Sequence, residues 1–280
     1  MAAVAKEARE ASVPQSPRVA LVLSVIIIIL VAIASAGGIF LPSLYRGNVW
    51  MVNANRGQDV YTLFVALPAM ALSVFAARRG AVRGLLVLAG IIGYMLYTYT
   101  GAALAYSLNE FFLIYVALFS LSLVGLIATL GAIDVESLKQ RFDRATPRRA
   151  VASYLAVLGL LLAMVEVGQL IPFFISGTLP QAMQLAEATS FFPYALDLGL
   201  VLPLCLLSAY WLWRGVAWGY VTTAVMLIKA ATMGLALLAT NGYAWAVGGV
   251  TDPMGILFGY GFIGLGGLGF AVSFLRHCRA

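Results

Sequence analysis

The sequence predicts an all-α integral membrane protein with eight transmembrane helices, arranged as two parallel four-helix repeats. The chain of 280 residues is 62% hydrophobic and only 10% charged, whereas a soluble domain is about 45 to 50% apolar. Its apolar side chains gather in eight runs, each close to the roughly 20 residues that an α-helix needs to cross a bilayer. Two segments that start at Val60 and Ala195 also match without a gap, which predicts an internal repeat.

The eight runs end at charged residues, at amides, or at Pro and Gly clusters. In chain order they cover residues 19–41, 60–77, 85–105, 111–132, 151–175, 196–213, 216–238 and 254–275. The polar connection between the fourth and fifth runs predicts a linker with a short amphipathic helix at the lipid surface. The expected parts of the chain are a cytoplasmic tail (1–18), a first four-helix repeat (19–132), the cytoplasmic linker (133–150), a second four-helix repeat (151–275) and a second cytoplasmic tail (276–280).

Lysine and arginine residues are distributed unequally between the two ends of these runs. Arg46 and Arg56 fall on one side of the predicted helices. The basic residues on the other side are Lys6, Arg9, Arg18, Arg78, Arg79, Arg83, Lys139, Arg141, Arg144, Arg148, Arg149, Arg214, Arg276 and Arg279. Cytoplasmic loops carry the excess of Lys and Arg, so both termini are predicted to be cytoplasmic. The net charge of +6 then suits membrane lipids with anionic head groups. We expect no nucleic-acid partner, because the sequence contains no basic domain apart from the predicted helices.

Few residues of this sequence could hold a cofactor or a metal. The two cysteines, Cys205 and Cys278, provide neither a disulfide framework nor a metal cluster. The only histidine, His277, excludes a haem held by two histidines. The sequence contains no Gly-rich phosphate loop, HExxH or GxSxG motif. We therefore expect no cofactor and no metal site.

The two matching segments begin "VYTLFVALPAM" and "ALDLGLVLPLC". Their alignment pairs Pro68 with Pro203 and the Arg-Gly turn at Gly80 with the turn at Gly215, which is more specific than the shared leucines. Each unit contains four helices, an even number, so both units enter the membrane from the same side. The predicted symmetry is a pseudo-two-fold axis along the membrane normal. Some transporters share such parallel repeats, and their sites tend to lie between the halves near the midplane.

A cation and a carboxylate are expected at the same depth in the membrane. Lys229 lies in the run 216–238 and Glu166 in the run 151–175, and both fall within about 5 Å of the midplane at about 1.5 Å per residue. An unpaired Lys there costs about 2.5 to 3.5 kcal/mol, so the sequence predicts that the two side chains pair. Gln169 continues the polar face that Glu166 begins.

The second repeat carries charges where the first carries hydroxyl groups. Asp197 aligns with Thr62, and Lys229 aligns with Tyr94. Tyr97 follows in the same motif, "YMLYTYTGA", so hydroxyls of one half are predicted to face charges of the other. The candidate ligand-binding residues are Lys229, Glu166, Gln169, Asp197, Tyr94 and Tyr97.

Each of these residues also has a structural interpretation. An intramembrane pair of Lys229 and Glu166 can fix helix packing without any ligand. Tyrosines at helical spacing often serve packing or the membrane interface. Asp197 and Asp59 are expected near the outer surface, where a carboxylate can be solvated.

The stretches "ALDLGLVLPLCLLSAYWLWRGVAWGYV", "NEFFLIYVALFSLSLVGLI" and "SAGGIFLPSLYRGN" resemble a family of uncharacterised bacterial multi-pass membrane proteins. The resemblance extends over most of the chain. It implies an eight-helix body and a location in the bacterial inner membrane. It implies no activity.

Three classes of function fit these residues. The first is binding or transport of a small polar, anionic or amphipathic ligand between the halves, at Lys229, Glu166 and the tyrosines. The second is a non-catalytic structural or accessory subunit of a membrane complex, and a homo-oligomer also fits the sequence. The third is an intramembrane enzyme that acts on a lipid or isoprenoid, with Glu166 or Asp197 as acid or base. A Schiff base between Lys229 and a retinal-like aldehyde is chemically feasible, but eight spans do not match the usual seven-helix photoreceptor.

Overall fold

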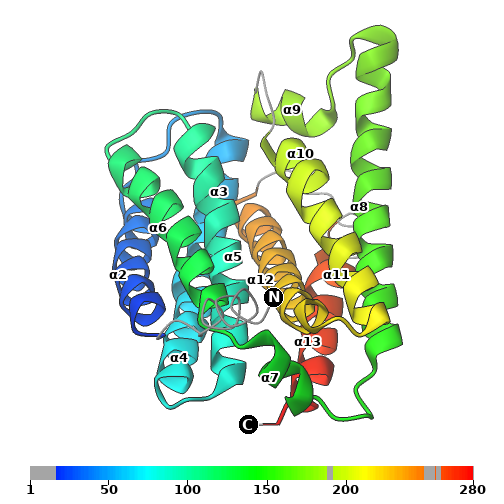
Figure 1. The fold of residues 1–280 in the computed structure, drawn as a ribbon. Coiled ribbons are helices and arrows are strands. Elements are labelled where there is room, and N and C mark those ends of the chain that lie inside the picture. The colour runs from blue at the N-terminus through cyan, green and yellow to red at the C-terminus, as the bar shows by residue number, and fades with distance from the viewer. Residues whose placement is uncertain (1–16, 188–191, 249–255, 257–259, 280) are drawn as a thin grey trace, which may run out of the picture.

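The computed structural model describes residues 17–187, 192–248, 256 and 260–279, which form helices joined by connections (Figure 1). Seven continuous helical segments of this described part are long and apolar enough to cross a membrane. They are Arg18–Phe40 (α2), Val49–Arg78 (α3, η1 and α4), Val82–Leu104 (α5), Phe112–Gly131 (α6), Arg148–Ser176 (α8), Phe192–Arg214 (α10, η2 and α11) and Ala217–Ala246 (α12). These helices indicate a multi-pass membrane protein.

The eighth predicted span, 254–275, is only partly described. Its described part comprises the π-helical segment η4 (Phe262–Gly266) of 5 residues and α13 (Gly267–Arg276) of 10 residues. At about 1.5 Å per residue these segments are shorter than a membrane crossing. The first part of the span lies outside the described residues, so an eighth transmembrane helix stays a prediction.

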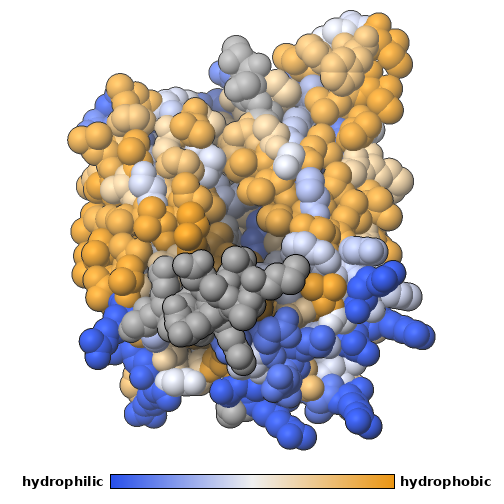
Figure 2. Space-filling view, in the orientation of Figure 1, coloured by the Kyte–Doolittle hydropathy of each residue, from blue (hydrophilic) through white to orange (hydrophobic). Residues whose placement is uncertain are grey.

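The two ends of the helix bundle differ in charge. Hydrophilic residues gather around α7 (Val135–Arg141) and the C-terminal residues, and an apolar belt covers the middle of the visible face (Figures 1 and 2). We call this end the basic end. The opposite end holds the short helix α9 (Gln181–Ala186), which is tied to the start of α3 by a hydrogen bond from Asn48 Nδ2 to the Leu185 carbonyl oxygen (2.7 Å).

Two helices are longer than the apolar runs that predicted them. The run 60–77 predicted a later start, but α3 begins directly after Asn48, whose side chain caps the helix by accepting a backbone hydrogen bond (2.9 Å). The run 216–238 likewise continues to the end of α12. The two extensions pack on each other, since a Cβ on Gly57 would lie 2.6 Å from Thr240 Cα. Hydropathy placed the start of the first helix too late and the end of the second too early, because protein packing, and not lipid, covers these polar turns.

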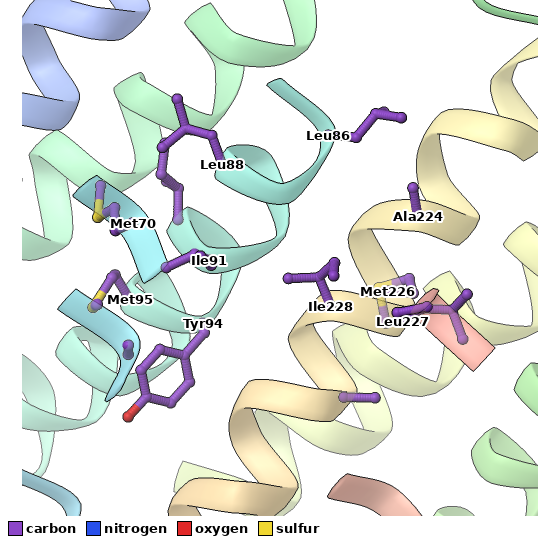
Figure 3. Close-up of a cluster of buried hydrophobic side chains, with 14 of the residues drawn as sticks. Met70, Leu86, Leu88, Ile91, Tyr94, Met95, Ala224, Met226, Leu227 and Ile228 are labelled. Atoms are coloured by element: carbon purple, nitrogen blue, oxygen red, sulfur yellow. The ribbon is translucent and has the colours of Figure 1, made fainter. Parts of the chain in front are cut away.

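The helices α5 and α12 are the most deeply buried of the seven. They pack against each other, and each contacts helices of its own half: α4 and α6 in the first half (α2 to α6), and α11 and α13 in the second half (α8 to α13). A Cβ on Gly90 would overlap with Ile228, so the absence of a side chain at Gly90 permits this close approach. Figure 3 shows Leu86 and Ile91 of α5 and Ile228 of α12 in the buried core.

Two of the long helices contain a π-helical turn before a Leu-Pro pair. The turn η1 (Thr62–Ala66) precedes Pro68 by two positions, and η2 (Asp197–Val201) stands in the same relation to Pro203. Proline has no backbone N–H, and its ring conflicts with the carbonyl four residues earlier; a wider turn relieves that conflict. The two turns are separated by the same number of residues as the two matching sequence segments.

The connections after these helices are also alike. Gly80 and Gly215 have positive φ values of 82° and 69°, which glycine adopts without strain. A Cβ on Gly84 would lie 2.7 Å from the backbone of α4, and a Cβ on Gly219 would lie 2.5 Å from the backbone of α11. In both places the chain turns back onto the preceding helix with a similar close contact.

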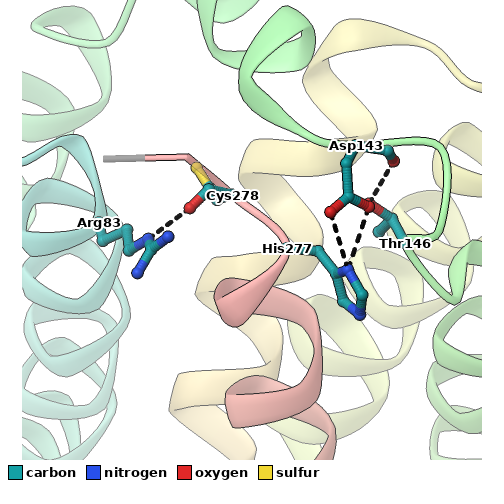
Figure 4. Close-up of polar contacts among 5 residues, drawn as sticks. All are labelled: Arg83, Asp143, Thr146, His277 and Cys278. Atoms are coloured by element: carbon teal, nitrogen blue, oxygen red, sulfur yellow. Dashed lines mark hydrogen bonds and ion pairs between the residues drawn. The ribbon is translucent and has the colours of Figure 1, made fainter.

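The C-terminal residues bind the start of α5 and the linker at the basic end (Figure 4). Arg83 donates a hydrogen bond from Nε to the Cys278 carbonyl oxygen. His277 Nδ1 lies 3.0 Å from Asp143 Oδ1. Leu138 of α7 is buried, and α7 packs on α12. The linker is therefore part of the folded bundle.

We expect Gly234→Leu to destabilise the protein, because the backbones of α12 and η4 touch at this glycine. A Cβ on Gly234 would overlap with the backbone of Gly264, and overpacking of this kind costs roughly 1 to 3 kcal/mol. The measurement is the thermal unfolding midpoint of the purified protein in detergent. Gly168→Leu is the matched control, since nothing lies within 4 Å of a Cβ at Gly168. Equal midpoints for the two variants would contradict the packing of α12 on η4.

The contact between Asp143 and His277 should stabilise the protein only where Asp143 is ionised. The hydrogen bond with His277 lowers the pKa of Asp143, so its contribution is present above the unfolded pKa of about 3.9 and is lost as the pH falls through the lower folded pKa. The effect is small because the Asp143 side chain is 37% exposed. Asp143→Asn should lower the unfolding midpoint slightly at about pH 6 and no longer do so at about pH 2. A midpoint difference that stays constant over this range would exclude the ionised contact.

Candidate functional site

Three charged side chains of the described residues are buried: Asp59, Glu166 and Lys229, which are 8%, 7% and 8% exposed. Charges inside a membrane are costly, and those that persist there usually have a partner or a functional role. Glu166 and Lys229 belong to a site between the two halves. Asp59 belongs to a separate cluster in the first half.

The ammonium group of Lys229 lies against an aromatic ring from the other half of the protein. Its Nζ is 4.2 Å from the centroid of the Tyr97 ring on α5, a distance at which a cation and a ring attract each other. The hydroxyl of Tyr97 donates a hydrogen bond to Asp197 Oδ2 (3.0 Å). The three side chains therefore connect α12, α5 and η2.

Lys229 and Glu166 form no direct ion pair, and a contact through one bridging water, which the predicted pairing also includes, stays a prediction. The ion pairs that the described residues form lie near the two ends of the bundle. Lys229 still acts electrostatically on Glu166, but Asp197 acts more strongly on both of them. Asp197 is the first residue of the π-helical turn η2. Apolar periodicity does not reveal such a turn.

This site contains two carboxyl groups for one ammonium group. Glu166 Oε2 is buried and has no hydrogen-bond partner among the described residues. Two carboxylates close together in a low-dielectric interior repel each other, so the site becomes neutral when one proton or one cationic group joins it. The arrangement fits a proton, a cationic group or a hydrogen-bond donor better than it fits an anion.

Gln169 lies one helical turn beyond Glu166, toward the opposite end of the bundle. Its Oε1 accepts a hydrogen bond of 2.6 Å from the hydroxyl of Tyr194, so Gln169 and Tyr194 join α8 to α10. The sequence analysis missed Tyr194. A signal was available, because Tyr194 precedes Asp197 by one helical turn and so shares its face of the helix.

Tyr94 lies apart from Lys229, although it belongs to the same helix as Tyr97. Its side chain is completely buried, and its hydroxyl pairs with Thr62 Oγ1 at 2.8 Å. The sequence alignment equates Thr62 and Tyr94 with Asp197 and Lys229. The structure brings the members of each pair near one another, as a hydroxyl pair in the first half and as a charged pair in the second.

Asp59 was expected near the surface, where water would solvate it, but it is buried inside the bundle. The reason is the early start of α3, which begins after Asn48 and so places Asp59 in the interior of a long helix. The apolar run 60–77 gave no sign of this, because the residues before it are polar.

The visible face of the protein is hollowed between the two halves. Figure 2 shows the hollow between α5 on one side and α10 and α11 on the other, with α12 behind it, and hydrophilic residues appear in its depth. The helices that border the hollow are those that carry Tyr97, Asp197 and Lys229. A small molecule could therefore approach this site from between the halves.

A scan against protein-family models finds no match, and searches of the curated proteins and of the solved structures find no similar chain. The likeness to a bacterial membrane-protein family stays an expectation from the sequence. The function is therefore inferred from the geometry of the site.

Proposed function

We propose that this protein binds a small polar or amphipathic ligand between its two halves, as a transporter or a ligand-binding membrane protein does. One observation carries the proposal: Lys229 and its neighbours come from four helical segments of both halves, yet Glu166 Oε2 has no partner among the described residues. A purely structural cluster normally satisfies its buried polar atoms. A ligand with a cationic or hydrogen-bond-donor group would provide the missing partner of Glu166 Oε2.

The surroundings of the site favour an amphipathic ligand. The hollow lies among mostly hydrophobic residues, and hydrophilic residues appear in its depth (Figure 2). Gln169 and Tyr194 supply an amide and a hydroxyl toward the opposite end. Pockets with apolar walls and a small number of placed polar groups are typical of small-molecule sites.

The proposal includes an internal repeat of eight helices, with residues 19–132 and 151–275 related by a pseudo-two-fold axis along the membrane normal. It is supported by the matching π-helical turns η1 and η2, by the glycines with positive φ at Gly80 and Gly215, and by the central position of α5 and α12. Sites between such halves serve transport in other proteins.

We further propose that both termini are cytoplasmic and that the membrane is a bacterial inner membrane. The excess of Lys and Arg at the basic end supports this orientation. The hydrogen bond between Arg83 and Cys278 places the C-terminal residues at that same end, which fits a final crossing of the membrane by the helix that ends in α13.

Removal of the buried cation should destabilise the fold. Lys229→Met leaves Glu166 and Asp197 without a cation, so we expect a loss of about 3 to 5 kcal/mol, measured as a lower unfolding midpoint in lipid nanodiscs. The triple change that adds Glu166→Gln and Asp197→Asn should restore most of the midpoint. A ligand-binding role also requires that the triple variant lose a small molecule that native mass spectrometry detects on the wild-type protein.

The matched control for these variants is Tyr94→Phe, at the corresponding position of the first half. It removes a hydroxyl that pairs with Thr62 and should leave the bound mass unchanged. A triple variant that folds and keeps the bound mass would rule out ligand binding at Lys229. A wild-type protein without any bound mass would instead support the scaffold interpretation.

Two substitutions of Tyr97 should separate its ring from its hydroxyl. Tyr97→Phe keeps the ring beside Lys229 and loses the hydrogen bond to Asp197, at about 0.5 to 1.5 kcal/mol. Tyr97→Leu also loses the ring contact, which should add about 0.5 to 2 kcal/mol. The unfolding midpoints of both variants, measured in the same nanodiscs, test whether Tyr97→Leu is less stable than Tyr97→Phe. If Tyr97→Leu is no less stable than Tyr97→Phe, the contact between ring and cation contributes nothing.

A further inference from the structure

A second buried carboxylate lies in the first half, outside the site of Lys229. The side chain of Asp59 is 8% exposed, and the hydroxyl of Tyr45 donates a hydrogen bond to its Oδ2. The carboxylate fits against α2 because residue 38 is glycine: a Cβ on Gly38 would overlap with Asp59 Oδ2. The packing of α2 on α3 thus leaves room for a negative charge.

Four tyrosines gather around this carboxylate. The ring centroids of Tyr45 and Tyr106 are 6.2 Å apart, those of Tyr106 and Tyr115 are 6.3 Å apart, and those of Tyr99 and Tyr115 are 6.3 Å apart. Asp59 acts electrostatically on all four. Tyr115 is 2% exposed, and its hydroxyl has no hydrogen-bond partner among the described residues. The cluster therefore contains a buried polar atom that the protein itself does not satisfy.

No basic side chain neutralises Asp59 within the described part of the chain. Neither of the two ion pairs found there includes it. Arg56, one turn earlier on α3, donates instead to the Pro42 carbonyl oxygen (3.1 Å). The groups that act favourably on the carboxylate are the hydroxyls of Tyr45 and Ser35. Neutral hydroxyls offset only part of the cost of a buried charge, so a cation would complete the cluster.

A small cavity beside Asp59 adjoins a larger pocket that opens at the opposite end. The cavity has a volume of about 10 Å³, which is room for about one water-sized particle. It shares Tyr45, Asn55 and Tyr106 with a pocket of about 360 Å³ that extends to Glu187. A small ion therefore has a place beside the carboxylate, and only the shared residues separate that place from the larger pocket.

We propose that Asp59 and the surrounding hydroxyls bind a sodium ion that enters through the larger pocket. Sodium is a hard cation, and hard cations prefer carboxylate, hydroxyl and carbonyl oxygens. One carboxylate balances one positive charge. The described residues hold no group of three or more His, Cys, Asp or Glu that would favour a divalent or transition metal. The size of the inner cavity admits a single ion and excludes an organic cation.

The sodium site uses none of the residues of the Lys229 site, so it stands independently of the proposed ligand. The helices of the two sites contact each other: α3 packs along α12, and a hydrogen bond joins α3 to α5. Gln58, which lines the small cavity, donates a hydrogen bond to Thr98 Oγ1 (2.9 Å), and Thr98 directly follows Tyr97. This contact attaches the cavity wall to the helix that carries the ring beside Lys229.

The test measures sodium binding by the full chain in lipid nanodiscs. At constant ionic strength, replacement of K⁺ by Na⁺ should raise the unfolding midpoint of the wild-type protein until the effect saturates, because a ligand that binds only the folded state stabilises it. Equilibrium dialysis with radioactive sodium should show a single saturable site per chain.

Two variants locate the ion. Asp59→Asn should abolish the sodium effect. Tyr115→Phe keeps the ring packing and removes a hydroxyl that has no partner among the described residues, so it should fold normally and bind sodium roughly tenfold more weakly. Asp143→Asn is the matched control: it changes a carboxylate at the basic end, outside both the cluster and the Lys229 site, and should leave sodium affinity unchanged.

Several outcomes would overturn the proposal. They are a wild-type protein that sodium does not stabilise, and a sodium effect that survives unchanged in both Asp59→Asn and Tyr115→Phe. Stronger stabilisation by tetramethylammonium than by sodium would assign the cluster to an organic cation instead. The cluster would be assigned to a proton if the unfolding midpoint depended on pH because of Asp59 and did not depend on sodium. Sodium binding that is lost in Asp59→Asn and kept in Asp143→Asn supports the proposal, whatever the result at Lys229.

Discussion

The contact between α5 and α12 is the constraint on which both buried charged sites depend. The two helices approach closely because Gly90 has no side chain. Further along the same pair, this approach brings Lys229 onto the ring of Tyr97. The Asp59 cluster is attached to the same pair, since Gln58 bonds to Thr98 on α5 and α3 packs along α12. A change that separates α5 from α12 would therefore disturb both charged sites at once.

Similar helical geometry carries different chemistry in the two halves. In the first half, Thr62 and Tyr94 form a neutral pair that needs no further partner. In the second half, the aligned residues Asp197 and Lys229 are charged and lie beside a hollow between the helices. A neutral pair is inexpensive in the membrane interior, whereas charges there must be balanced by further groups. The charged pair of Asp197 and Lys229 is therefore the one that involves residues from both halves.

Part of this structure could be read from the sequence, and the rest could not for identifiable reasons. Seven of the apolar runs correspond to helices, and the residues flagged as polar and buried include Lys229 and Glu166. The stronger electrostatic action of Asp197 on Lys229 was not predicted, because hydropathy does not show which carboxylate lies nearer to a buried cation. Asp59 was placed at the surface because α3 extends through polar residues that the run 60–77 excluded. The error at Asp59 arises because protein packing, and not water, covers this polar stretch of α3.

The hydrogen bonds at the basic end connect residues that are made at very different times. Arg83 pairs with Cys278, and the Arg141 carbonyl oxygen accepts from the Arg279 backbone N–H at 2.9 Å. At roughly 5 to 20 residues per second, the ribosome needs on the order of ten seconds or more to proceed from the first partner to the second. During that interval α5 and the linker lack these final contacts. The basic end of the bundle can close only after the residues that follow α13 have been synthesised, so assembly of this end is completed after insertion of the earlier helices.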